Sequence, residues 1–114
     1  MKNLTISRID ATNPVVRDYV NVIKSWNSDS EINVEKDNKI LPFYAIYFNA
    51  RFLAAGTISF DKETSVAQIA MINNSSSFYS SIIENEAQLG LESIALNEYQ
   101  PKNIEFNRVK QKRR

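Results

Sequence analysis

Regular spacings of apolar residues divide the first part of the chain into a strand and a helix. Leu4–Ile9 begins with strict alternation of apolar and polar residues, which predicts a strand. Asn13 followed by Pro14 is typical of a helix start, because asparagine can accept a hydrogen bond from a free backbone N–H and proline is tolerated in the first turn. The helix is predicted to run to about Trp26. Its apolar residues form one stripe, which consists of Val16, Tyr19, Val20, Ile23 and Trp26.

The middle of the chain changes from a polar segment to three apolar strands. Residues 27–39 are mostly polar and predict a loop with at most one helical turn. Three strands joined by short hairpin turns are predicted next, over Phe43–Phe48, Phe52–Phe60 and Thr64–Ile72. The first two strands are apolar at both alternating sets of positions, so we expect both faces of the sheet to be covered.

The last third of the chain predicts a long helix and a closing strand. Asn73–Ser77 breaks the third strand, and a helix that starts between Ser76 and Ser81 runs to about Tyr99. Its buried face is predicted to consist of Tyr79, Ile82, Ile83, Ala87, Gly90, Leu91, Ile94 and Ala95. A short strand, Asn103–Phe106, follows, and a right-handed crossover through the helix would make it parallel to the third strand.

This order predicts an α+β fold with a mixed, mainly antiparallel sheet and helices on both faces. The length of 114 residues, 43% of them hydrophobic, suits one core, so we expect residues 1–107 to form a single domain. Residues 108–114 are expected to be a basic flexible tail. No stretch has the pattern of a secretory signal or a membrane span, and we therefore expect a cytoplasmic protein without a membrane partner.

Charge is distributed unevenly along the chain. Residues 108–114 carry five of the fourteen Lys and Arg residues, so the nine in the rest of the chain face thirteen Asp and Glu and give it a net charge of −4. An acidic body with a basic end is not typical of a nucleic-acid-binding surface, and we expect no nucleic-acid partner.

The residue types that the chain lacks narrow its chemistry. Without Cys or His it cannot form a Cys/His zinc site, a thiol nucleophile, a Ser/His triad or a histidine acid–base pair, and we expect no metal. With only two glycines, Gly56 and Gly90, it cannot form a Walker-type phosphate loop or a G-x-G-x-x-G turn.

The stretch Pro42–Ala55, which reads PFYAIYFNARFLAA, and the order of elements over residues 4–106 resemble the first two thirds of the GNAT N-acetyltransferase superfamily. The resemblance implies that acetyl-CoA lies between two splayed strands and that its pantetheine arm pairs with Val66–Ile72, where it would contact Ala70, Met71 and Ile72. It also implies that the pyrophosphate binds at the start of the long helix, in the loop Asn73–Ser81. The serines of that segment are the candidate contacts: Ser75, Ser76, Ser77 and Ser81.

Three features depart from the superfamily pattern. The loop has no glycine, and Tyr79 stands where the first glycine of the pattern would be. Lys62 is the only basic residue between Arg51 and Lys102, so the loop brings no cation for the phosphates. The superfamily continues with a further helix and strand pair, which often supplies a tyrosine as general acid, whereas this sequence ends shortly after Phe106.

Several polar residues have both a functional and a structural interpretation. Asn73–Ser77 either forms an anion site or ends the strand and caps the helix. Asp61 and Glu63 either include a general base or form a hairpin turn. Three tyrosines act as phenolic acids or belong to the core, namely Tyr44, Tyr47 and Tyr79.

Two charged surfaces also have both a functional and a structural interpretation. The long helix has no Lys or Arg, and its glutamates form either a solvated face or a surface for a basic partner: Glu84, Glu86, Glu92 and Glu98. Residues 108–114 either contact RNA or a membrane surface or serve as a solubilising tail.

Two functions follow from these observations. In the first, an amine of a small molecule or peptide attacks the thioester of acetyl-CoA directly, the backbone of Val66–Ile72 orients the carbonyl, as the resemblance implies, and no residue is assigned as catalytic. In the second, the same scaffold is a non-catalytic protein-binding or regulatory module, which uses the acidic helix or an unpaired sheet edge. Such an edge also allows a homodimer that extends the sheet.

Overall fold

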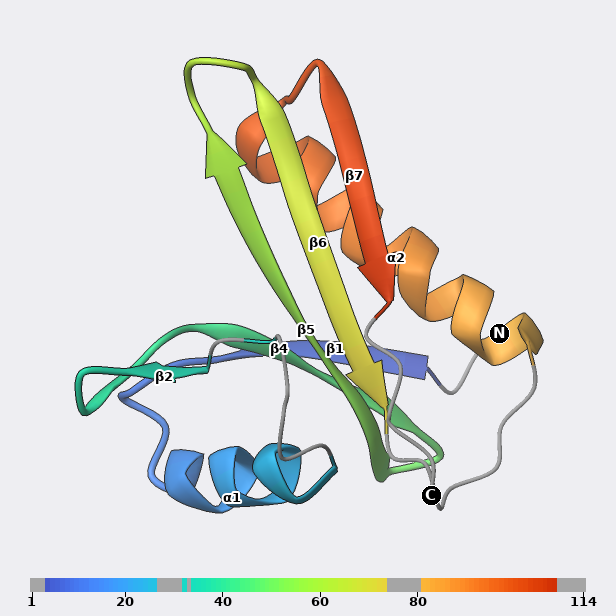
Figure 1. Cartoon of the computed structure of the whole chain (residues 1–114). Helices are drawn as coiled ribbons and strands as arrows, with labels where there is room; N and C mark the ends of the chain where they lie inside the picture. Colours follow the sequence, from blue (N-terminus) through green and yellow to red (C-terminus); the bar gives the residue numbers. More distant parts are fainter. Residues whose placement is uncertain (1–3, 27–31, 33, 74–80, 109–114) are drawn as a thin grey trace, which may run out of the picture.

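The computed structural model describes residues 4–26, 32, 34–73 and 81–108. In chain order their elements are β1 (Leu4–Ile9), α1 (Val16–Trp26), β2 (Glu35–Lys36), β3 (Lys39–Ile40), β4 (Phe43–Phe48), β5 (Arg51–Asp61), β6 (Val66–Asn73), α2 (Ser81–Tyr99) and β7 (Asn103–Arg108) (Figure 1). No helix in this part of the chain is long and apolar enough to cross a membrane.

Five strands form one mixed sheet in the order β1-β4-β5-β6-β7. Neighbouring strands are antiparallel except β6 and β7, which are parallel and are joined through α2. The two helices pack on opposite faces of this sheet (Figure 1). The predicted α+β fold with a mixed, mainly antiparallel sheet and helices on both faces is therefore confirmed.

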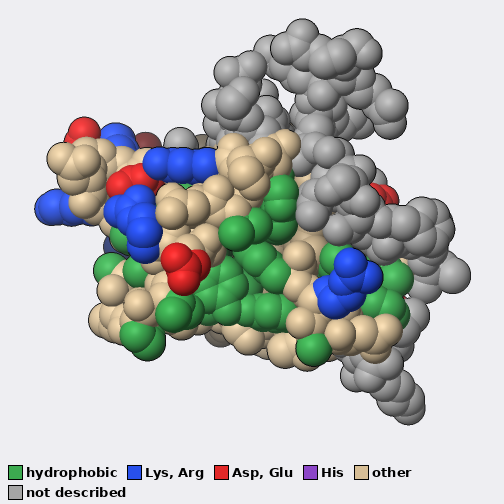
Figure 2. Space-filling model, turned by 90° about the horizontal axis from the view of Figure 1, so that it is seen from below, with side chains coloured by type: hydrophobic (Ala, Val, Ile, Leu, Met, Phe, Trp, Pro, Cys, Tyr) green, Lys and Arg blue, Asp and Glu red, His purple; other side chains and the backbone are tan. Residues whose placement is uncertain are grey.

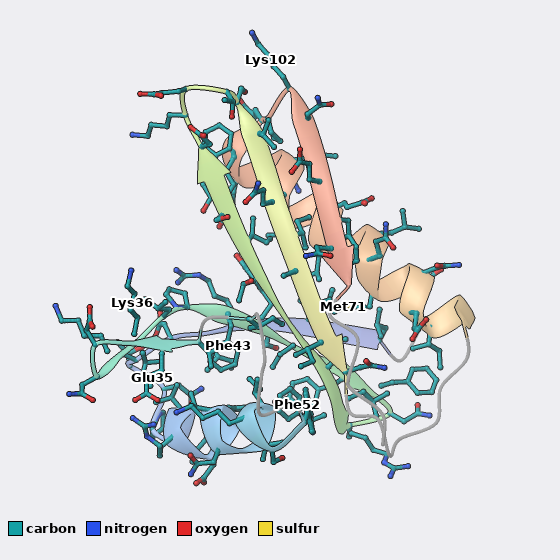
Figure 3. All side chains as sticks on the ribbon, viewed as in Figure 1. Glu35, Lys36, Phe43, Phe52, Met71 and Lys102 are labelled. Atoms are coloured by element: carbon teal, nitrogen blue, oxygen red, sulfur yellow. The ribbon has the colours of Figure 1, made fainter. Side chains whose placement is uncertain are left out.

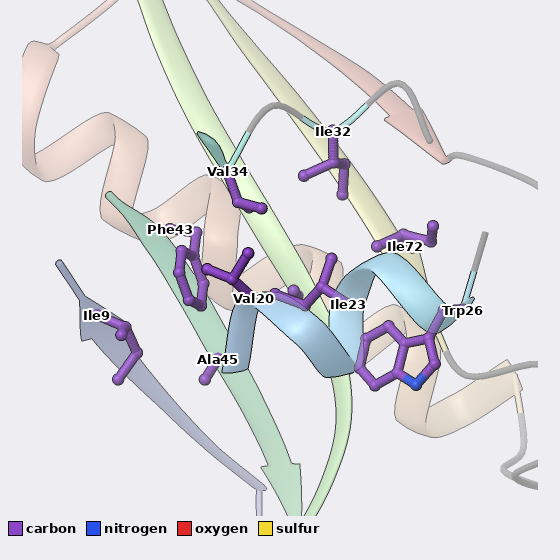
Figure 4. Close-up of a cluster of buried hydrophobic side chains, with 10 residues drawn as sticks. Ile9, Val20, Ile23, Trp26, Ile32, Val34, Phe43, Ala45 and Ile72 are labelled. Atoms are coloured by element: carbon purple, nitrogen blue, oxygen red, sulfur yellow. The ribbon is translucent and has the colours of Figure 1, made fainter. Parts of the chain in front are cut away.

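The first apolar cluster lies between α1 and the sheet (Figure 4). Val20, Ile23 and Trp26 of α1 are buried there, as the predicted stripe requires. The helix begins two residues later than predicted, because Asn13 Oδ1 accepts a hydrogen bond from Val15 N at 2.9 Å and the turn before α1 takes up Pro14.

An extra residue in β5 allows the aromatic side chains to gather under α1. Ile46 pairs with Ala54 but Tyr47 pairs with Phe52, so Leu53 is a β-bulge. Because of this bulge, Phe52 and Ala55 both face α1, although they are three positions apart in a strand whose side chains alternate between its faces. The Phe52 ring lies 5.1 Å from the ring of Tyr19 and 5.0 Å from that of Trp26.

The polar segment before β4 differs from its prediction. In its described part, β2 and β3 form a small antiparallel hairpin where a loop with at most one helical turn was expected. The turn consists of Asp37 and Asn38, which both have positive φ, at 54° and 65°, as a two-residue type I′ turn requires. Ion pairs from Glu35 to Arg17 and Lys24 connect this hairpin to α1, and Figure 2 shows charged side chains gathered at one side of the α1 end of the molecule.

The second apolar cluster lies between α2 and the other face of the sheet. Ala87, Leu91 and Ala95 are buried, while Ile94 is partly buried against the cluster. Of the predicted buried face, Tyr79 and the side chain of Ile82 lie outside the described residues. Ala87, Leu91, Ile94 and Ala95 therefore agree with the predicted helical spacing, whereas Ile83 and Gly90, which were also predicted to be buried, are half-buried.

The closing strand β7 is two residues longer than predicted and includes Arg108. It pairs with β6 in parallel from Val66↔Asn103 to Met71↔Arg108, which confirms the predicted parallel arrangement. Residues 109–114 of the expected tail lie outside the described residues, and the boundaries of domain and tail stay a prediction.

Candidate functional site

α1 covers only part of its face of the sheet. The strands β5, β6 and β7 extend well beyond α1 (Figure 1). Side chains alternate between the two faces of a strand, and on this open part of the α1 face the alternate positions are mostly polar. They are Thr57 and Ser59 on β5, Gln68 on β6, and Glu105 and Asn107 on β7.

These polar residues line a hollow with a volume of about 730 Å³, together with Leu41 and Pro42 at its side. A second hollow of about 380 Å³ shares Ser59, Gln68 and Glu105 with the first and adds Asp61 and Thr64. The two hollows share part of their lining over β5, β6 and β7, and we call them together the sheet groove. The larger hollow is in the size range of small-molecule sites, and the groove is open, because Ser59, Gln68 and Glu105 are exposed. Figure 3 shows the side chains on these strands.

The register of the sheet orders the groove in rows. Ser59 pairs with Gln68, and Gln68 pairs with Glu105. Gln68 Nε2 donates a hydrogen bond of 3.3 Å to Glu105 Oε1, which connects two exposed side chains of neighbouring strands. Among the described residues that line the larger hollow, Glu105 is the only titratable one.

The next row of the groove contains one of the predicted cofactor contacts. Ala70 pairs with Thr57 and Asn107 and forms part of the groove floor. Met71 and Ile72 are buried on opposite faces, Met71 in the α2 cluster and Ile72 in the α1 cluster. Their side chains therefore lie on opposite faces of the sheet. A ligand at this end of β6 could contact both residues only through their backbone groups.

The end of β6 is where the resemblance implies that two strands splay apart. In the described residues, β6 and β7 stay paired as far as Met71↔Arg108, and β6 continues through Ile72 and Asn73. Of the predicted phosphate contacts, Ser75, Ser76 and Ser77 lie outside the described residues. Ser81 is the first residue of α2, and its side chain is likewise outside them.

The tyrosines considered as acids lie away from the groove. The hydroxyls of Tyr19 and Tyr47 are hydrogen-bonded to each other under α1. Burial and this hydrogen bond raise the pKa of Tyr47 to about 12. Tyr44 is buried on the α2 face, where burial and then the charge of Glu98 raise its pKa. Neither Tyr44 nor Tyr47 lines the groove, and Tyr79 lies outside the described residues.

The turn between β5 and β6 contributes to the groove. Asp61 Oδ1 accepts a hydrogen bond of 2.9 Å from Glu63 N, which is the turn geometry expected of an aspartate at a strand end. Asp61 also lines the smaller hollow, while Glu63 lines neither. The structural interpretation of Asp61 thus holds, and its carboxylate faces the groove as well.

Sequence reasoning missed Gln68 and Glu105. Each is a polar residue flanked by apolar ones, in Val66–Ile69 and in Asn103–Phe106, and this alternation was the available signal. Where the structure describes the chain, no group of three or more acidic residues is placed to hold a metal ion.

Comparison with known proteins gives structural likenesses only. No protein-family model matches the chain, and no curated protein sequence matches it. An integron cassette protein from the mobile metagenome of V. cholerae superposes with a TM-score of 0.53 at 17% identity, over 94% of this chain and 76% of that one.

A ribosomal-protein-alanine N-acetyltransferase from Brucella melitensis biovar Abortus 2308 superposes with a TM-score of 0.57 at 7% identity, over 94% of this chain and 81% of that one. At such identities the likeness concerns the fold. The chain has a GNAT-like fold, as its resemblance to that superfamily implies.

Proposed function

We propose that this protein transfers an acetyl group from acetyl-CoA to an amine that binds in the sheet groove. The observation that supports this most directly is the place of Glu105, a carboxylate held by Gln68 in an open groove on a GNAT-like fold. The groove ends at Ala70, next to the segment of β6 that the resemblance assigns to the pantetheine arm.

The resemblance implies that the pantetheine arm lies along the end of β6. Ala70 and Met71 are paired with β5 on one side and with β7 on the other, so the arm would pair with the backbone of Ile72, beyond the last β6–β7 pair of the described residues, and would reach Ala70 and Met71 only where β7 separates from β6. The bound coenzyme would supply an activated thioester carbonyl. The phosphates would be held near the start of α2, where the positive end of the helix dipole favours an anion. Ser75, Ser76, Ser77 and Ser81 remain the proposed contacts there.

Glu105 would serve as the proton acceptor. An amine enters the groove as an ammonium ion, and its proton passes to the carboxylate of Glu105, which Gln68 keeps oriented. The nitrogen lone pair then forms a bond to the thioester carbonyl carbon, the carbon–sulfur bond breaks, and the surplus proton of the nitrogen ends on sulfur. The products are an amide and a free thiol.

A thiol-release assay tests this proposal with little background, because the chain has no cysteine of its own. We expect acetyl-CoA and an amine to release thiol detectable with Ellman's reagent. Glu105→Gln should lower kcat/KM about a hundredfold or more while the thermal shift caused by acetyl-CoA is retained. Glu63→Gln, a carboxylate outside the groove, is the matched control and should leave the rate unchanged.

An absence of both thiol release and thermal shift at millimolar acetyl-CoA would contradict the proposal. A thermal shift that persists together with an unchanged rate in Glu105→Gln would contradict only the role of Glu105.

The alternative is a protein-binding module, and the outer side of α2 favours it. Leu89 and Leu96 are 60% and 50% exposed, and they lie seven residues apart on one side of a helix with four glutamates and no Lys or Arg. Repulsion between glutamates would oppose the binding of the α2 helix of a second copy, so the partner would be a basic amphipathic helix.

A synthetic helix with leucines seven residues apart and flanking lysines should bind, and a version with glutamates in place of the lysines should not. Leu89→Ala should weaken the binding of the lysine peptide.

A homodimer through the sheet edge also stays a prediction. β1 and β7 are the two edge strands of the described sheet. Light scattering at several concentrations would detect dimers that pair through an edge.

A further inference from the structure

We infer that the amine bound in the sheet groove is a linear diamine, with one nitrogen at Glu105 and the other at Asp61. This inference rests on the proposed function and names its acceptor. The second nitrogen would lie in the smaller hollow, which takes no part in the acetyl transfer.

The charged residues that line the groove in the described part of the chain are of one sign. Among the described residues that line the two hollows, Asp61 and Glu105 are the only charged ones. Lys62, which follows Asp61 in the turn, lines neither hollow. Lys102 lies at the same end of the molecule, and its side chain extends away from the sheet (Figure 3).

The uncharged polar residues also suit a donor-rich ligand. Thr57 and Ser59 of β5 and Thr64 of the turn have hydroxyl oxygens, and Gln68 and Asn107 have amide oxygens, all of which can accept hydrogen bonds from an ammonium group. Leu41 and Pro42 provide apolar contact at one side of the groove for a hydrocarbon chain. The groove thus offers acceptors for two ammonium groups and apolar surface for a carbon chain.

The register gives the spacing of the two carboxylates. Glu105 shares a row with Ser59, and Asp61 is two residues further along β5 and two strands away from Glu105. Strand spacings of about 4.8 Å and rises of about 3.3 Å place the two Cα atoms about 12 Å apart. Two ammonium groups at these carboxylates would lie about 6–12 Å apart, which an extended chain of about four to eight carbon atoms spans.

The direction of binding follows from the same rows. Glu105 is one row from Ala70, and Asp61 is at the far end of the groove. The nitrogen at Glu105 is therefore the one that loses a proton and is acetylated, and the nitrogen at Asp61 stays an ammonium ion. Acetylation removes one of the two charges, so the product binds more weakly than the substrate.

The test compares cadaverine with pentylamine, which has the same carbon chain and one amino group. With saturating acetyl-CoA, the wild-type protein should give a kcat/KM about tenfold higher for cadaverine. Asp61→Asn should lower the value for cadaverine about tenfold and leave that for pentylamine unchanged. The asparagine side-chain oxygen can still accept the hydrogen bond from Glu63 N, so the turn is retained, and Glu63→Gln should change neither value.

Equal kcat/KM values for the two amines, or a cadaverine rate that Asp61→Asn does not change, would overturn the inference and leave the proposed function standing. If no thiol is released at all, isothermal calorimetry measures whether cadaverine binds to the protein without acetyl-CoA. Binding that Asp61→Asn weakens about tenfold, with weaker binding of pentylamine, supports the diamine site without the reaction, and an absence of such binding refutes it.

Discussion

Gly56 of β5 lies directly against Leu91 of α2. A Cβ atom on Gly56 would be 2.7 Å from Leu91 Cδ1 and 3.3 Å from Leu91 Cδ2, and it would also be 3.4 Å from the carbonyl oxygen of Ala70. Leu91 is completely buried. The leucine therefore packs on the backbone of β5, and α2 owes its close approach to the sheet to the absence of a side chain at Gly56.

Gly56→Ala is accordingly expected to lower the free energy of unfolding by about 1–3 kcal/mol, because the added methyl group overpacks a filled site. Leu91→Ala alone should lower it by about 2–5 kcal/mol through the cavity it leaves. The double variant should be less destabilised than the sum of the two, since each change relieves the other. Urea unfolding measures all three, and strict additivity would show that the two residues do not share this space.

Ala50 carries backbone strain in the turn between β4 and β5. Its φ is 65°, in the left-handed region where an alanine side chain is unfavourable and glycine is not. Ala50→Gly should raise the free energy of unfolding by about 0.5–1 kcal/mol. Ala11, an exposed turn residue whose φ is not positive, is the control, and Ala11→Gly should be neutral or destabilising. Thermal unfolding of the two variants would decide, and a lower Tm for Ala50→Gly would contradict the expectation.

The hydrogen bonds from Arg17 and Lys24 lower the pKa of Glu35 from its ordinary value of 4.5 to about 2. A carboxyl whose pKa is depressed by folding stabilises the fold above its unfolded pKa, and this contribution is lost as pH falls through the folded pKa. The difference in Tm between the wild type and Glu35→Gln should thus be constant above about pH 5 and shrink as pH falls from about 4.5 to about 2. A difference that does not change over this range would show that the ion pairs add no stability. Glu63→Gln is the control with an exposed carboxyl.

Tyr47 has its pKa raised to about 12 by burial and by its hydrogen bond to Tyr19. Absorbance titration should show that Tyr44 and Tyr47 both ionise above the ordinary value of 10.0, with Tyr47 at about 12. Since folding favours the neutral form of Tyr47, the stability it contributes is present below pH 10 and is lost as pH rises toward 12. Tyr19→Phe should lower the pKa of Tyr47 but keep it above the ordinary value, because burial is the larger cause. A Tyr47 that titrates normally in the folded protein would contradict this account.

The strands and helices could largely be predicted because their apolar residues form helical stripes or continuous runs between turns. The stripe of α1 is an example of the first and the apolar runs of β4 and β5 of the second, and the burial of Val20 and Phe43 agrees with them. The hairpin of β2 and β3 was missed because strands of two residues have no period. Its signal was chemical: Asp37 and Asn38 are among the residues that tolerate positive φ.

The groove could not be predicted because it depends on register between distant segments. Gln68 and Glu105 are 37 residues apart in sequence and meet only through the parallel pairing of β6 with β7. Within each strand, the alternation shows that one polar side chain points to the face opposite the apolar ones. It does not show which residue of the other strand lies beside that side chain. The open part of the α1 face was likewise not predicted, since its extent depends on where α1 ends in space.

The two edge strands differ from the central three in how far along the chain their partners lie. β4, β5 and β6 are joined by short turns, whereas β1 and β7 pair across separations of more than thirty residues. Long-range pairing closes large loops, so we expect the central meander to assemble first and β7 to join late and open early. Glu105 therefore lies on a strand that we expect to open early. A ligand that bridges Glu105 and Asp61 would stabilise the pairing of this strand with the central meander. Binding should therefore slow amide hydrogen exchange in β7 more than in β4.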